Sequence, residues 1–129
     1  MNPKRVLLID DQTGVTRLIK IALERGEHHI VREENDSTKA VGAAREFQPD
    51  IIFCDVDMPK MDGGEVARQI RQDPRLAHVP LVFLTSLATA QDANRTLGGF
   101  PILAKPVPID TIQRAIEEHT AKVQREPVA

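Results

Sequence analysis

IIFCDVDMPKMDGG, residues 51–64, is the stretch that decides the fold. It begins with an apolar run without alternation, which is typical of a strand covered on both faces of a parallel sheet. Asp55 closes this strand, and Pro59, Gly63 and Gly64 interrupt regular structure, so that a loop leads into a short helix over residues 64–71. We therefore predict a central strand whose carboxyl end carries acidic side chains.

Short apolar runs alternate with segments of helical periodicity on both sides of this strand. We predict strands at residues 5–9, 29–32, 51–54, 81–84 and 102–104, with a helix after each, the fourth over 89–97 and the last from 109. Such alternation is typical of an α/β fold in which a doubly wound, five-stranded parallel sheet is covered by five helices. Residues suited to cap or end helices flank these segments: Gly26, Asn35, Asp36, Ser37, Gly98 and Gly99.

The composition excludes several classes of protein. A chain of 129 residues, 41% of them hydrophobic, has enough apolar side chains for the core of one domain. A formal net charge of −2 without a run of Lys or Arg gives no electrostatic footprint for nucleic acid or for an anionic membrane. The apolar runs are too short to span a bilayer, and the first residues do not form a signal peptide, so we expect a cytoplasmic protein.

The cysteine and the histidines carry no predicted chemistry. Cys54 is the only cysteine, which excludes an internal disulfide, and its place in a strand predicts a buried thiol. The histidines lack the spacing of metal ligands, and we expect all of them at the surface: His28, His29, His78 and His119.

Charged and polar side chains stand where the predicted strands end. Asp10 and Asp11 close the first strand, Asp55 closes the third, and Thr85 and Lys105 follow the fourth and fifth. The carboxyl ends of parallel strands meet at one edge of a sheet, where open α/β folds bind ligands. Two carboxylates about 5 Å apart repel by roughly 3 kcal/mol, and a bound divalent cation removes that repulsion. Ligands that are all oxygen fit Mg²⁺ better than zinc or copper.

A phosphoryl site follows from this arrangement. A phosphoryl donor would present its oxygens to the Mg²⁺ on one side and to Lys105 on the other, with Asp55 as the in-line nucleophile. The product would be an aspartyl phosphate. Thr85 would donate its hydroxyl to a phosphoryl oxygen, and its movement would draw the following loop with it. We therefore expect a switch as well as a reaction.

Four motifs, VLLIDD, DVDMPKMDGG, LTS and AKP, occur in this order along the chain. Together they make residues 4 to 122 resemble the CheY-like receiver domains of two-component response regulators. The resemblance implies the strand order 2-1-3-4-5, which is the order known for this fold class, and a cis peptide between Lys105 and Pro106. It also implies a role for each site residue: phosphoacceptor for Asp55, direct Mg²⁺ ligand for Asp11, water-mediated ligand for Asp10, ligand through the backbone carbonyl for Asp57, switch for Thr85 and phosphate contact for Lys105.

The resemblance further implies the partners and the domain organisation. A sensor histidine kinase or a histidine phosphotransfer protein would donate the phosphoryl group, and the chain would catalyse its own phosphorylation and dephosphorylation without being an enzyme for another substrate. A downstream protein target would bind the face from Thr89 to Lys122. Residues 1–124 would form the receiver domain, and we expect 125–129 to be a short disordered tail. The chain would be either a receiver that stands alone or a fragment of a larger regulator.

The sequence departs from the family pattern in two places, neither of which touches the phosphorylation chemistry, and the first concerns the switch. Ile102 stands three residues before Lys105, where the family usually carries a tyrosine or phenylalanine, and Phe100 lies two residues earlier. The second departure is Gly99-Phe100-Pro101, which is more flexible and more apolar than the usual acidic turn, together with Ser86, which replaces the common alanine after the threonine. Asp57 and Leu87 are at positions where family members vary their dephosphorylation rate.

Three other functions fit parts of the pattern. Asp55-Val56-Asp57 resembles the D-x-D motif of haloacid dehalogenase phosphatases, although in those the motif lies on the first strand, and turnover of a phosphomonoester would support this interpretation. A flavodoxin-like FMN carrier would share the fold, but its first loop needs hydroxyls and amides rather than two carboxylates. A receiver that docks without phosphate would not need to keep all five site residues. Taken singly, each Asp could cap a helix, and Lys105 could be a surface lysine.

Overall fold

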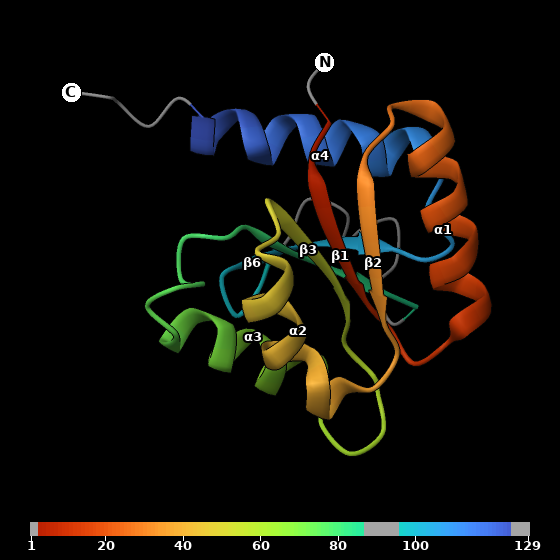
Figure 1. Cartoon of the computed structure of the whole chain (residues 1–129). Helices are drawn as coiled ribbons and strands as arrows, with labels where there is room; N and C mark the ends of the chain where they lie inside the picture. The colour runs from red at the N-terminus through yellow and green to blue at the C-terminus, as the bar shows by residue number, and fades with distance from the viewer. Residues whose placement is uncertain (1–2, 87–95, 125–129) are drawn as a thin grey trace.

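The computed structural model describes residues 3–86 and 96–124, and within them six strands form one sheet with helices on both faces (Figure 1). The strands lie in the order β2-β1-β3-β4-β6-β5. The parallel strands are β1 (Arg5–Ile9), β2 (Ile30–Glu34), β3 (Ile51–Asp55), β4 (Leu81–Thr85) and β6 (Phe100–Ala104). The predicted doubly wound α/β fold is confirmed, as is the order 2-1-3-4-5 for the parallel strands, with β6 as the fifth.

Two pairs of helices cover the two faces of the sheet. The described helices are α1 (Thr13–Gly26), α2 (Ala40–Phe47), α3 (Gly63–Gln72) and α4 (Ile109–Gln124), with a short 3₁₀ helix, η1 (Ser37–Lys39), before α2. Alternate residues of each strand point to opposite faces. In β1, Val6 and Leu8 therefore pack under α1 and α4, whereas Leu7 and Ile9 pack under α2 and α3.

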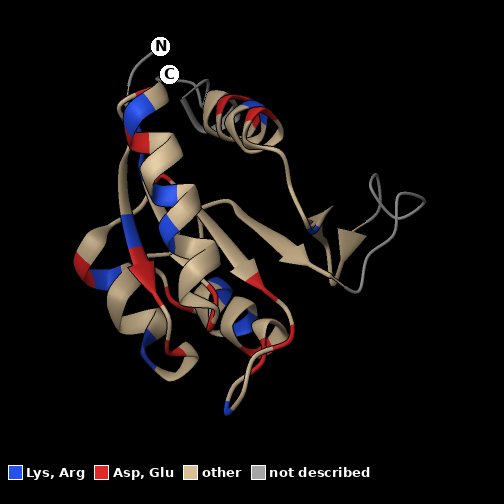
Figure 2. Cartoon of the chain, turned by 90° about the vertical axis from the view of Figure 1, so that its right-hand side faces the viewer, with Lys and Arg blue, Asp and Glu red and all other residues tan. Residues whose placement is uncertain are grey.

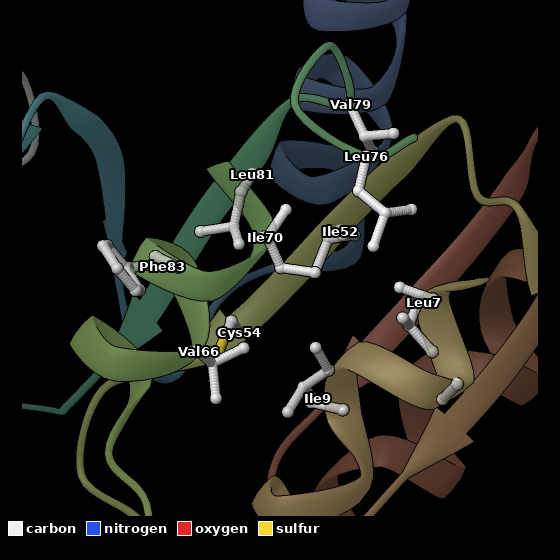
Figure 3. Packing of buried hydrophobic residues seen from close by; sticks show 14 of the residues in the cluster. Leu7, Ile9, Ile52, Cys54, Val66, Ile70, Leu76, Val79, Leu81 and Phe83 are labelled. Atoms are coloured by element: carbon white, nitrogen blue, oxygen red, sulfur yellow. The ribbon is translucent and has the colours of Figure 1, made fainter. Parts of the chain in front are cut away.

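The core consists of two apolar layers, one on each side of the sheet. Figure 3 shows the layer under α3, where Val66 and Ile70 lie over strand residues such as Ile52 and Phe83. Cys54 belongs to this layer and has no exposed surface, so the predicted buried thiol is confirmed. Burial raises the pKa of the Cys54 thiol far above its ordinary value, which keeps it protonated and unreactive.

A β-hairpin occupies the end of the predicted helix 89–97. Residues 89–95 lie outside the described residues, but Thr96 and Leu97 form β5 (Thr96–Leu97), which pairs antiparallel with β6. Gly98 and Gly99 connect the two strands with φ values of 60° and 89°. A two-residue turn with both φ positive suits the right-handed twist of a hairpin, and glycine adopts it without strain. The predictions of helix at 96–97 and of a glycine helix stop were therefore wrong, and the described helices number four rather than five.

His29 is buried, with 2% of its surface exposed, which contradicts the expected surface position. Pairing of Ile30 with Arg5 brings His29 beside Lys4 at the amino ends of the strands. The backbone N–H of Lys4 donates to His29 Nδ1 at 2.9 Å, while Nε2 has no partner among the described residues. Burial, together with the charge of Lys4, lowers the pKa of His29 despite the opposing charges of Glu27 and Glu117.

Acidification is expected to destabilise the fold through His29. Protonation would remove the acceptor of the Lys4 N–H and place a charge in a buried site. Because the folded-state pKa lies below the ordinary value of 6.5, the stability that neutral His29 contributes is full above pH 6.5 and is lost as the pH falls below it. Melting temperatures at about pH 7.5 and about pH 5.5 should differ more for the wild type than for His29→Gln. The exposed His78→Gln variant should behave like the wild type, and equal pH dependence in all three would contradict the assignment.

The helices of the described residues include none that combines the length and the apolarity needed to cross a bilayer.

Candidate phosphoryl and metal site

Three carboxylates meet at the carboxyl ends of β1 and β3. Ile9 pairs with Cys54, so the next residues, Asp10 and Asp55, lie side by side across the two strands. One carboxylate oxygen each of Asp10, Asp11 and Asp55 lies within 4.8 Å of the others. Figure 2 shows acidic positions gathered at these strand ends, below the first turn of α1. The cluster could bind a metal ion, because hard divalent cations prefer carboxylate oxygens.

The Asp10 side chain is buried and fully engaged. Its Oδ1 accepts from the backbone N–H of Gln12 at 2.9 Å, and its Oδ2 accepts from Lys105 Nζ at 2.5 Å. Asp11 differs, because it is exposed and its carboxylate has no hydrogen bond or ion pair among the described residues. Asp11 therefore offers a free anionic ligand beside an anchored one.

Lys105 reaches the acidic cluster from the end of β6. Its backbone N–H donates to the Thr85 carbonyl at 3.0 Å, and its Nζ lies 3.4 Å from Asp55 Oδ2. Burial lowers the pKa of Lys105, but the hydrogen bond and charge of Asp10, with the charge of Asp55, outweigh burial and raise it overall. The ammonium group therefore stays charged. The peptide between Lys105 and Pro106 is cis, as the resemblance implied.

Asp55 ends β3 and has 7% of its surface exposed. Its Oδ1 accepts from the backbone N–H of Val56 at 2.8 Å. Burial and the charge of Asp10 raise the pKa of Asp55 in spite of Lys105. Negative charge at Asp55 is therefore incompletely balanced, a condition that a bound cation relieves. Thr85, at the end of the adjacent β4, is likewise buried.

The loop after β3 ends at Gly63, which packs against the backbone of Asp55 and Val56 at the end of that strand. The backbone N–H of Gly63 donates to the Val56 carbonyl at 2.8 Å, and Asp62 caps α3 by accepting from the Glu65 N–H at 2.9 Å. A Cβ on Gly63 would lie 2.1 Å from the Asp55 carbonyl oxygen, so only glycine fits there. Asp57 lies in this loop, and its exposed side chain is not part of the carboxylate cluster.

An open groove of about 1140 Å³ begins at the carboxylates and runs along α1. Asp55 and Lys105 line one end of it. The apolar part of its lining comes from α1 and from the connection before α4: Val15, Leu18, Ile19, Ala22, Pro106 and Val107. Leu18 is 71% exposed, which is unusual for a leucine and marks an apolar surface next to the charged site.

The aromatic side chain near the predicted switch is Phe100. Its ring contacts the Phe83 ring edge-on with centroids 5.6 Å apart, and the Arg71 guanidinium lies 4.5 Å from the centroid of the Phe100 ring. Ile102 lies on the same face of β6 and is buried against the core. An aliphatic residue therefore occupies the predicted switch position, and the aromatic ring is held against α3.

The structure brings four of the predicted site residues together and adds two that sequence reasoning missed. Asp10, Asp11, Asp55 and Lys105 form one cluster, and Thr85 borders it through the Lys105 backbone. Asn35 was interpreted only as a helix cap, and Thr16 was not singled out. Both lie behind the Asp10 backbone. Nothing in the sequence identifies them, because their spacing in the chain matches no site motif.

Comparison with known proteins gives a consistent result. A family model described as response regulator receiver domain matches residues 6–117. The DNA-binding dual master transcriptional regulator RpaA of Synechocystis sp. is 32% identical over 97% of this chain, which spans 52% of that protein. The polar-differentiation response regulator DivK of Brucella anthropi is 27% identical over 91% of this chain and 96% of its own length. A crystal structure of a response regulator from Desulfuromonas acetoxidans superposes with a TM-score of 0.79 at 26% identity, over 92% of this chain and 97% of that one.

Proposed function

This chain belongs to the response regulator receiver domain family, and from that premise we propose that it accepts a phosphoryl group on Asp55 in a Mg²⁺-dependent reaction. The observation that carries the proposal is the meeting of three carboxylates with one lysine ammonium group at the ends of β1, β3 and β6. We further propose that the receiver domain spans residues 1–124.

The metal site would use oxygen ligands of the cluster. We assign Asp11 as a direct ligand, Asp10 as a ligand through water, Asp55 as a ligand through its carboxylate and Asp57 through its backbone carbonyl. The exposed carboxylate of Asp11, unpaired among the described residues, and the raised pKa of Asp55 support a cation here. The chemistry that Mg²⁺ supplies when bound is neutralisation of the phosphoryl oxygens.

The chain's own residues would perform the transfer. An Asp55 oxygen forms a bond to phosphorus while the P–N bond of a phosphohistidine breaks, and the electron pair returns to the imidazole nitrogen of the donor. Lys105 balances charge on the phosphoryl oxygens, and its salt bridge to Asp10 holds it near Asp55. Thr85 donates its hydroxyl to the aspartyl phosphate. The aspartyl phosphate is the signalling form of the protein, and hydrolysis of this acyl phosphate returns Asp55 to its free carboxylate.

Magnesium is expected to raise the melting temperature of the wild type. At 100 times its dissociation constant a ligand stabilises the folded state by about 2.7 kcal/mol, which is roughly 10 °C for a chain of this size. Asp11→Asn should lose most of this shift without unfolding, because its side chain makes no hydrogen bond or ion pair with the part of the chain that the structure describes. Glu46→Gln, a surface carboxylate on α2, should keep the shift. A wild type that melts at the same temperature with and without millimolar Mg²⁺ would refute the metal site.

The partners would be proteins on both sides of the reaction. The apolar groove supports a donor whose phosphohistidine is carried on a helical protein, since the groove is continuous with Asp55. The output surface is proposed on the face from Thr89 to Lys122, part of which lies outside the described residues. Amide NMR should show shifts over residues 12–22 when a histidine phosphotransfer protein is added, and shifts over residues 96–121 only after phosphorylation. No change in the second set on phosphorylation would contradict this output surface.

A further inference from the structure

Asn35 lies just after β2 and reaches across to the connection between β1 and α1. Its Nδ2 donates to the Asp10 backbone oxygen at 2.7 Å and to Thr16 Oγ1 at 3.0 Å. Thr16 is 1% exposed, and Asp10 is 4% exposed. A carbonyl oxygen only accepts, so the amide nitrogen must face Asp10. The Asn35 amide nitrogen therefore donates to two acceptors behind the carboxylate cluster, the Asp10 carbonyl and the Thr16 hydroxyl.

Thr16 extends this contact into a network. Its hydroxyl accepts from Asn35 and lies 2.7 Å from Glu33 Oε1, to which it donates. Glu33 in turn accepts from Arg17 Nε through its other oxygen at 3.0 Å. Each member thus has a partner, and satisfied networks of this kind restrict the groups that they join. The network fixes the end of β2 to the first turns of α1.

The Asp10 carbonyl belongs to the peptide group that joins Asp10 to Asp11. Holding its oxygen fixes the plane of this peptide and so the direction in which Asp11 leaves β1. Asp10 has its own anchors in Gln12 and Lys105. The Asp11 carboxylate has none among the described residues, so its place in the cluster depends on the backbone.

We propose that Asn35, supported by Thr16, is a positioning residue that holds Asp11 ready for the metal ion. The proposal rests on the metal-dependent phosphoacceptor function proposed above. Neither side chain would touch the metal or the phosphoryl group, because both act through the Asp10–Asp11 peptide. Removal of a group that hydrogen-bonds to and orients a metal ligand, without binding the metal itself, typically weakens metal affinity by 10–100-fold.

The test is the Mg²⁺ dissociation constant, measured by amide NMR titration of wild type, Asn35→Ala and Thr38→Ala. We expect Asn35→Ala to bind Mg²⁺ about tenfold more weakly than wild type. Thr38→Ala is the matched control, because it removes a hydroxyl that donates to Asp36 in the same connection without touching Asp10. Its affinity should stay within about twofold of wild type. Thr16→Val, which keeps the Asn35 bond to Asp10, should give an intermediate loss.

A second measurement separates positioning from general damage. The rate of phosphorylation of Asn35→Ala by acetyl phosphate should be slow at low Mg²⁺ and return towards the wild-type rate at saturating Mg²⁺, which a damaged fold would not allow. Asn35→Ser takes the same test if the alanine variant does not fold. Wild-type Mg²⁺ affinity in the Asn35 variant would overturn this inference alone. Absence of Mg²⁺ binding by the wild type would overturn the proposed function as well.

Discussion

Replacing Asp55 by asparagine is expected to abolish the phosphoryl adduct while the protein stays folded. The amide keeps the shape of the carboxylate at the end of β3 but is no nucleophile. Burial and the charge of Asp10 raise the pKa of Asp55, so its ionised form is disfavoured in the folded state and opposes folding at neutral pH. Asp55→Asn should therefore melt no lower than wild type in metal-free buffer. Intact mass after acetyl phosphate and Mg²⁺, with parallel melting curves, measures both effects.

A variant that loses the phosphoryl adduct but keeps its melting temperature identifies a carboxylate that serves function rather than the fold. A surface control is Glu46→Gln, which breaks an exposed ion pair to Arg32 and should form the adduct as the wild type does. A labile adduct at the wild-type level in Asp55→Asn would place the phosphoryl group on another residue. A variant that melts well below wild type would show instead that Asp55 serves the fold.

The positions of the strands were predictable because burial on both faces leaves a clear pattern, whereas their order was implied by the resemblance to receiver domains. Runs such as residues 51–54 and 81–84 are apolar without alternation, and few structures other than a central parallel strand explain them. The carboxylate cluster followed for the same reason, since Asp10 and Asp55 are the first residues beyond two such runs. Register then places them side by side, as the pairing of Ile9 with Cys54 shows.

The hairpin β5–β6 was not predictable from the same pattern. Gly98 and Gly99 end helices and also form two-residue turns, and the sequence alone does not distinguish the two uses. Only the φ values and the pairing of Leu97 with Phe100 do so. The surface position predicted for His29 was wrong for a similar reason. Its buried ring accepts a hydrogen bond from the backbone N–H of Lys4, which is far away in sequence. The Asn35 contact to Asp10 also joins residues that only the sheet brings together.

Gly63→Ala is expected to destabilise the protein by about 3 kcal/mol, at the upper end of the range for overpacking. The new Cβ would lie 2.1 Å from the Asp55 carbonyl oxygen and 2.9 Å from Val56 Cα. These are backbone atoms of Asp55 and its neighbour, so relief of the clash requires the end of β3 or the start of α3 to move. Such movement displaces Asp55, so that phosphorylation by acetyl phosphate should slow as well. Urea denaturation measures the loss of stability.

The adjacent glycine provides the matched control. A Cβ on Gly64 would meet only Asp62 Oδ1, 3.4 Å away, which is close to an ordinary van der Waals contact, and alanine is favoured over glycine in a helix by roughly 0.5–1 kcal/mol. Gly64→Ala should therefore be neutral or slightly stabilising and should keep the phosphorylation rate. Equal stability of the two variants would mean that the loop from Asp55 to α3 adapts freely. The position of Asp55 would then not depend on the close approach at Gly63.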